Sequence, residues 1–166
     1  MQATAVDTNQ IWKYMEEDRR LKAAESFYAD ESLRQFQQAA DQFIARTKNF
    51  RVPFVKRLPV QKRAWYLAHL SIPQDVMAQL IISYHFALQR PMMAAFLNAL
   101  GIANNNGSID EKAEVETPAK ERLEAAVQAV RDQFLAEDVN IYLATLYAQN
   151  SEVWGELAPY IPELAR

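Results

Sequence analysis

Apolar residues recur at the spacing of an α-helix along almost the whole chain, and only three of its 166 residues are glycine. A repeat of three or four residues places apolar side chains on one helix face, whereas a half-buried strand requires strict alternation. No segment alternates convincingly. Ala, Leu, Gln, Glu and Arg, which all favour helices, are abundant. The sequence therefore predicts an all-α fold.

Prolines and capping residues divide this pattern into six or seven helices. A proline is tolerated in the first turn of a helix, so Pro59, Pro73 and Pro91 mark helix starts. The pair Thr117 and Pro118 marks another start, because a capping hydroxyl precedes a proline. The predicted helices span residues 7–28, 32–47, 59–70, 73–89, 91–100 and 118–135, with a seventh from 138 and one or two turns after 150.

A chain of this length suits one domain with a substantial core. The helix over 73–89 has the widest apolar stripe, so Leu80, Ile81 and Tyr84 are expected to be among the most buried residues. Residues 103–116 form the longest polar stretch and are predicted to be a flexible linker. The helices after it are too few to bury their own apolar faces. We therefore predict a single, irregular, bundle-like domain over residues 1–166.

Motifs that carry catalysis are absent from the sequence. Without cysteine, the chain has no thiolate nucleophile, no thiolate metal ligand and no disulfide. Its glycines are isolated, so no dinucleotide fingerprint or phosphate-binding loop is present. Neither His69 nor His85 belongs to a Glu-x-x-His or His-Glu-x-x-His pattern. We predict no catalytic residue, no metal site and no cofactor, and the sequence favours a binding protein over an enzyme.

One alternative function is that of a small-ligand-binding protein or an enzyme, with a pocket near the predicted helices over 73–89 and 91–100. Histidine at the edge of the most apolar predicted helix can titrate or bind a ligand. Methionine adapts its shape to apolar ligands and to partner helices. Ordinary core packing is the simpler interpretation of the same pattern, because methionines beside aromatic residues usually belong to the core. The residues of this candidate pocket are Tyr84, His85, Met92 and Met93.

Positive charge is concentrated in one segment of an acidic chain. Residues 42–74 contain seven basic residues and no acidic residue, although the net charge of the chain is −3. Four aromatic residues, Phe50, Phe54, Trp65 and Tyr66, lie between them. Two prolines in "NFRVPFVKRLP" predict that this part is an irregular connector. The basic residues are Arg46, Lys48, Arg51, Lys56, Arg57, Lys62 and Arg63.

Three explanations for the basic segment remain open. Its charges are solvated or face acidic residues of the same chain, or they bind an acidic protein partner, or they bind nucleic acid or anionic lipid. The sequence pI of about 5.5 argues against a dedicated nucleic-acid-binding domain, which is usually basic overall. We rank the explanations in this order. The predicted function is a binding or scaffolding module that acts through protein–protein contacts, with a second copy of the chain among the candidate partners.

The expected location is the cytoplasm. The first ten residues, "MQATAVDTNQ", lack the basic and apolar regions of a secretory signal peptide. No apolar run approaches the roughly 20 residues that a membrane-spanning helix needs. These features predict a soluble protein.

Overall fold

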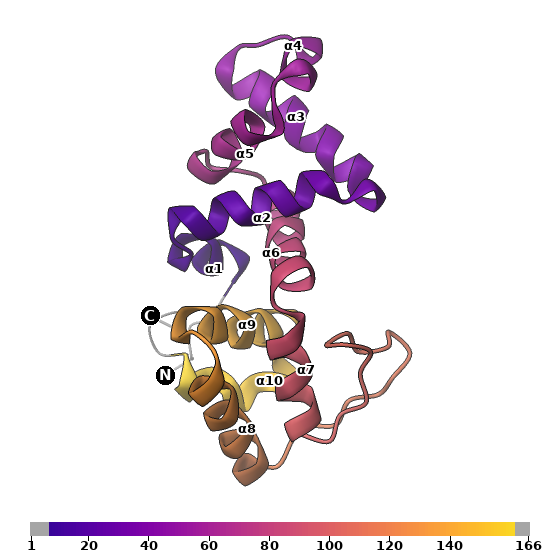
Figure 1. Ribbon diagram of the computed structural model, residues 1–166, viewed down its shortest axis with the longest axis vertical. Coiled ribbons are helices and arrows are strands. Elements are labelled where there is room, and N and C mark those ends of the chain that lie inside the picture. The colour runs from indigo at the N-terminus through magenta and orange to yellow at the C-terminus, as the bar shows by residue number, and fades with distance from the viewer. Residues whose placement is uncertain (1–6, 162–166) are drawn as a thin grey trace. The chain divides into compact units, whose positions relative to one another are not determined.

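The computed structural model describes residues 7–161, and within this range the fold is all-α (Figure 1). Helices contain 75% of the described residues, and these residues form no strand. The predicted fold class is therefore confirmed. The predicted number of helices is wrong, because the described residues form ten α-helices rather than six or seven.

The helices fall into two compact units, and the predicted single domain stays a prediction. Unit 1 joins the residues up to Tyr14 to those from Leu88 onward, and unit 2 runs from Met15 to Ala87. In unit 2 the elements are α2 (Glu17–Ala29), the 3-10 helix η1 (Glu31–Leu33), α3 (Arg34–Lys48), α4 (Val52–Arg57), α5 (Val60–His69) and α6 (Gln74–Leu88), whose last residue belongs to unit 1. In unit 1 they are α1 (Thr8–Tyr14), α7 (Arg90–Ala99), α8 (Lys120–Gln133), α9 (Ala136–Gln149), α10 (Ser151–Trp154) and the 3-10 helix η2 (Gly155–Tyr160).

One additional helix arises because the predicted helix over 7–28 is interrupted. Glu16 has extended backbone angles, with φ −71° and ψ 163°, so α1 ends before it and α2 begins after it. Glu17 and Asp18 then occupy the first turn of α2. Acidic residues are stabilising at a helix N-terminus, because they interact favourably with its free amide groups. The acidic run thus favours a new helix start over a continuous helix.

A second additional helix, α4, lies where the sequence predicted an irregular connector. Pro53 falls in the first turn of α4. Amide groups in the first turn have no partner within the helix, so a proline there costs no helical hydrogen bond. Leu58, which precedes Pro59, adopts extended angles and ends the helix. The two prolines therefore delimit a short helix instead of preventing one.

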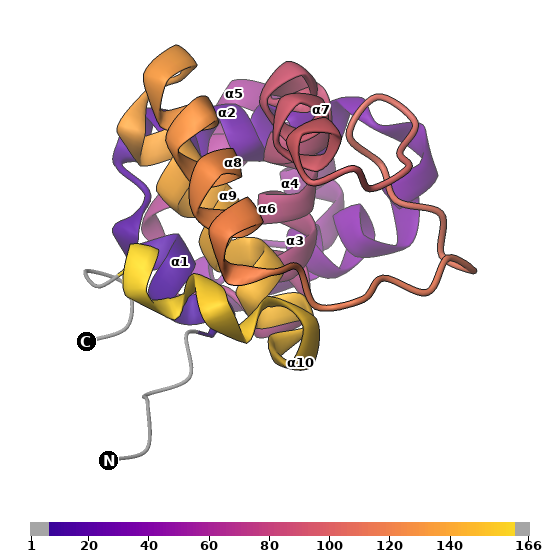
Figure 2. The same ribbon diagram turned by 90° about the horizontal axis from the view of Figure 1, so that it is seen from below.

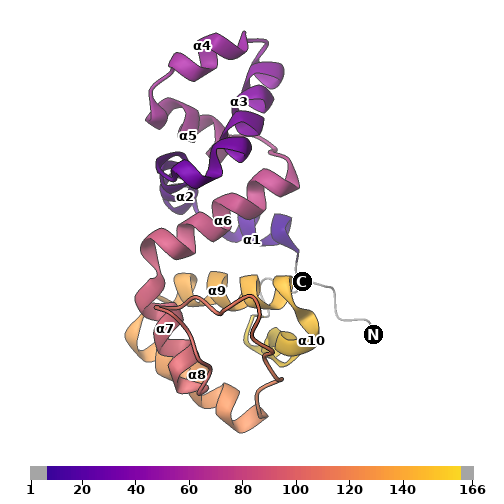
Figure 3. The same cartoon turned by 90° about the vertical axis from the view of Figure 1, so that its right-hand side faces the viewer.

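In unit 1, α9 is surrounded by its neighbours (Figure 3). It packs against α1, α8, α10 and η2, and most of its residues from Asp138 to Tyr147 are buried. Helix α7 packs against α8. Phe96 of α7 lies edge-on to Tyr142 of α9, with ring centroids 5.6 Å apart, and 6.0 Å from Trp154 of α10. These aromatic contacts connect α7, α9 and α10 in one core.

In unit 2, α5 packs against both α2 and α3. Phe27 of α2 and Leu67 of α5 are fully buried. The expectation for α6 is confirmed, since Leu80, Ile81 and Tyr84 are only 0%, 2% and 3% exposed.

The segment from 103 to 116 contains a turn that is held against α7 (Figure 2). Asn105 and Ser108 exchange backbone hydrogen bonds of 2.8 and 3.1 Å. The guanidinium of Arg90 donates to the carbonyl of Asn106 at 3.2 Å. Gly107 is buried so closely against Met93 that a Cβ atom at this glycine would lie 2.6 Å from the Cβ of Met93. The flexibility of the segment as a whole stays a prediction.

No helix within residues 7–161 combines the length and the apolar character needed to cross a bilayer.

Candidate anion-binding surface

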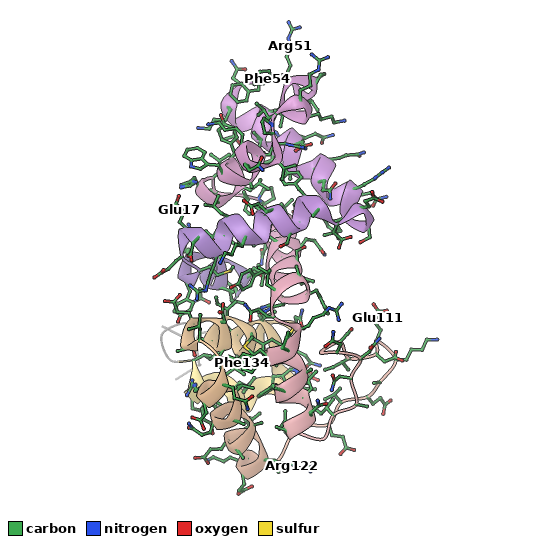
Figure 4. All side chains as sticks on the ribbon, viewed as in Figure 1. Glu17, Arg51, Phe54, Glu111, Arg122 and Phe134 are labelled. Atoms are coloured by element: carbon green, nitrogen blue, oxygen red, sulfur yellow. The ribbon has the colours of Figure 1, made fainter. Side chains whose placement is uncertain are left out.

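The basic segment forms one end of unit 2 (Figures 1 and 3). Its basic residues lie on the last turn of α3, at and just before α4, and on the first turn of α5, and α4 packs against α3. The anchor of α4 is Val55, which is fully buried, while Phe54 and Lys56 on either side are exposed. Arg51 and Phe54 both extend outward at this end (Figure 4). The backbone therefore directs a basic and an aromatic side chain, three residues apart, into solvent.

Six of the seven basic residues are exposed and have no carboxylate within 4.0 Å among the described residues. We call these six residues the basic surface. Of the seven, Arg63 alone forms an ion pair within the described part of the chain. The other six are exposed, which is compatible with the solvated charges of the first-ranked explanation as well as with an external partner. The residues of the basic surface are Arg46, Lys48, Arg51, Lys56, Arg57 and Lys62.

Arg63 belongs to a buried network that joins α2, α3 and α5. Its guanidinium lies 3.3 Å from Oδ2 of Asp41, and the hydroxyl of Tyr28 donates to Oδ1 of Asp41 at 2.8 Å. The same guanidinium lies over the Tyr28 ring, 4.7 Å from its centroid. Burial, followed by the charge of Asp41, raises the pKa of Tyr28 far above its ordinary value, so the phenol remains a donor. The sequence offered no local signal for this network, because its members lie far apart along the chain.

Asp41→Asn should lower the free energy of unfolding by roughly 1.5–3 kcal/mol, the typical contribution of a hydrogen bond to a charged group. The amide oxygen can still accept from Tyr28, but the ion pair with Arg63 is lost. Urea unfolding followed by circular dichroism measures the change. Glu25→Gln is the matched control, because Glu25 is exposed on α2 in the same unit. Equal stability of the two variants would contradict a stabilising role for the network.

Helix capping does not explain all of these charges. Cations near a helix C-terminus interact favourably with the free carbonyls, which suits Arg46 and Lys48 on α3 and Lys56 and Arg57 on α4. Lys62 lies instead in the first turn of α5, where a cation is unfavourable, and neither α4 nor α5 has an acidic residue in its first turn. Interaction with a helix terminus therefore does not account for the positive charge of Lys62.

Aromatic rings form a cluster beside the basic surface. Phe50 contacts both Phe54 and Tyr66, with ring centroids 5.1 and 6.1 Å apart. The Lys62 ammonium lies 4.9 Å from the Trp65 ring centroid and 5.1 Å from that of Tyr66. Phe54 and Trp65 are 50% and 42% exposed, which is unusual for large aromatic side chains. The surface therefore combines positive charge with exposed apolar rings.

The candidate pocket residues are all buried. Tyr84 and His85 are each 3% exposed on α6, in unit 2. Met92 and Met93 are 0% and 5% exposed on α7, in unit 1, where the turn at Gly107 covers Met93. Ligand binding at these residues stays a prediction.

A hollow of about 470 Å³ lies elsewhere in unit 1, between the end of α7 and the start of α8. Its charged lining residues, Glu114, Glu116 and Arg122, are all exposed. Residues 113–119 of the loop before α8 provide part of its lining.

Within residues 7–161, no group of three or more His, Asp or Glu side chains is arranged to hold a metal ion. Comparison of the chain with protein families, curated proteins and solved structures finds no match.

Proposed function

We propose that the protein is a helical binding module, not an enzyme, and that it contacts an anionic partner through the basic surface. The observation that carries this proposal is the absence of carboxylates within 4.0 Å of those six side chains among the described residues. Clustered charges of one sign attract an oppositely charged partner and accelerate its association. An acidic protein face, a polyanion and an anionic lipid surface all provide the required charge.

The acidic character of the rest of the chain makes the cluster more significant. The net charge is −3 and residues 42–74 contribute +7, so the remaining residues carry −10. If the net charge of −3 were spread evenly over the surface of the protein, every face would repel anions. Exposed like charges within one segment also repel each other and destabilise the folded state. A binding role is a direct reason for the fold to retain them.

Retention on immobilised heparin, a generic polyanion, tests the proposal. The wild-type protein should be retained at low salt, because binding by several cations releases counterions and weakens steeply as salt increases. The triple variant Arg51→Gln, Lys56→Gln and Arg57→Gln should elute without retention. The control Lys22→Gln, Lys112→Gln and Lys120→Gln removes the same charge from exposed positions elsewhere and should elute like the wild type. A wild-type protein that is not retained, or equal losses in both triple variants, would overturn the proposal.

A further inference from the structure

The part of the surface formed by residues 50–60 has an unusual composition. Every side chain in it is either apolar or basic, and none is acidic or neutral polar. All are at least partly exposed except Val55. Phe54 is 50% exposed and Val60 is 36% exposed. The basic side chains of this segment are those of Arg51, Lys56 and Arg57, and all three are exposed.

We infer that residues 50–60 dock onto a bilayer surface that contains anionic phospholipids. This inference rests on the proposed function, since it names the source of the anionic charge. Basic side chains near such a membrane are attracted to its negative surface potential. Exposed aromatic and aliphatic side chains enter the boundary between headgroups and acyl chains. Both kinds of side chain are needed for stable attachment, and both occur in this segment.

The local structure is suited to this insertion. Val55 packs α4 onto the rest of the unit, and the neighbouring Phe54 therefore projects outward (Figure 4). The backbone amides of Phe54 and Val55 donate to the carbonyl of Arg51, and that of Leu58 donates to Val55. Amide groups that are already bonded avoid the desolvation penalty of entering an apolar environment. Trp65 is a further exposed aromatic residue of the kind enriched at membrane interfaces.

Single-stranded nucleic acid fits the aromatic residues less well. Base stacking needs open ring faces. The Trp65 ring is stacked on His69 with centroids 4.3 Å apart, and the Lys62 ammonium approaches the ring as well. On α5, Lys62 lies three positions before Trp65 and His69 lies four positions after it, so the two residues flank the ring from opposite directions along the helix. Internal contacts therefore occupy stacking surface that a base would use.

A protein partner also fits the composition less well. Protein interfaces contain about one hydrogen bond per 100–200 Å² and are surrounded by a polar rim. Residues 50–60 offer no Ser, Thr, Asn or Gln. A lipid headgroup layer needs only cations for its phosphates and apolar groups for its interior, which is what this segment provides.

Vesicle sedimentation tests the inference with the full chain. At about 100 mM salt we expect binding to phosphatidylcholine vesicles that contain about 30% phosphatidylserine, and no binding to phosphatidylcholine alone. Tryptophan fluorescence gives a second readout, because Trp65 is exposed whereas Trp12 and Trp154 are each only 4% exposed. Its emission should shift to shorter wavelength when the anionic vesicles are added.

Two variants separate the contributions of charge and apolar insertion. Removing the charges of Arg51, Lys56 and Arg57 by glutamine should weaken binding about a hundredfold. Phe54→Ser should weaken it about tenfold or more without changing heparin retention. Leu135→Ser is the matched apolar control, because Leu135 is 68% exposed in unit 1, and it should bind vesicles like the wild type.

The outcomes distinguish failure of the lipid inference from failure of the proposed function. Retention on heparin without binding to anionic vesicles would overturn the lipid inference and leave the proposed function intact. Vesicle binding unaffected by Phe54→Ser would also overturn it, because insertion would then play no part. Tighter binding to single-stranded polyuridine than to vesicles would favour nucleic acid as the partner. If the wild-type protein neither binds anionic vesicles nor is retained on heparin, both the lipid inference and the proposed function are overturned.

Discussion

Leu80→Ala is expected to lower the free energy of unfolding by roughly 2–5 kcal/mol. Leu80 lies in the middle of α6 and is fully buried, with Ile81 and Tyr84 buried beside it. Truncation removes three carbon atoms from an apolar environment and leaves a cavity that the surrounding side chains fill only in part. The effect depends on burial rather than on helix propensity, because alanine and leucine are both strong helix formers.

Urea unfolding followed by circular dichroism measures this change, and Leu135→Ala serves as its control. Leu135 precedes the first turn of α9 and is 68% exposed, so the same truncation there should change stability by no more than about 0.5 kcal/mol. Comparable losses in the two variants would mean that α6 does not form part of a packed core.

Helix positions were predictable wherever a proline or an apolar stripe fixed them. Helices α5 and α6 begin one residue after their predicted starts, and α7 begins one residue before its predicted start. The agreement is close because Pro59, Pro73 and Pro91 restrict the local backbone. The buried face of α6 was predicted from its apolar residues. Both signals act within a few residues of the chain, so the sequence contains them directly.

The two missed helices depend on interactions that a periodic pattern does not contain. Short helices are marginal on their own, so α4 forms because Val55 packs onto the unit and not because of intrinsic propensity. The break between α1 and α2 depends on one extended residue, Glu16, within a run that is compatible with a continuous helix. Tertiary packing thus stabilises α4, whereas the acidic first turn of α2 favours the break at Glu16.

The candidate surface was predictable in its charge but not in its exposure. The seven basic residues and the missing acids can be counted in the sequence. Which of them finds an internal partner depends on the fold, which brings Asp41 to Arg63 but brings no described carboxylate to the other six. The same holds for the aromatic residues, because Phe54 and Trp65 are exposed whereas Phe50 and Tyr66 are half-buried. The sequence alone does not show which of these rings faces solvent.

Gly107→Ala is expected to destabilise unit 1 by roughly 2–4 kcal/mol, through backbone strain and steric overlap together. Gly107 has φ +89°, a conformation that residues with a side chain rarely adopt. The added Cβ would lie 2.6 Å from the Cβ of Met93 and 3.2 Å from the carbonyl oxygen of Arg90. Both atoms are attached to the α7 backbone and cannot rotate away, so the turn must move off the helix.

Gly155→Ala provides the control for this substitution. Gly155 has helical angles of φ −57° and ψ −31°, and a Cβ there would meet no atom within 4 Å. Alanine at such a position should be neutral or stabilise the protein by about 0.4–1 kcal/mol, because it restricts the unfolded chain. The measurement is the free energy of unfolding of both variants, with limited proteolysis after Lys112 as a local readout. We expect Gly107→Ala to accelerate cleavage there, because a displaced turn no longer holds the loop against α7. Equal stability and equal cleavage rates in the two variants would mean that the turn does not contribute to the core through Met93.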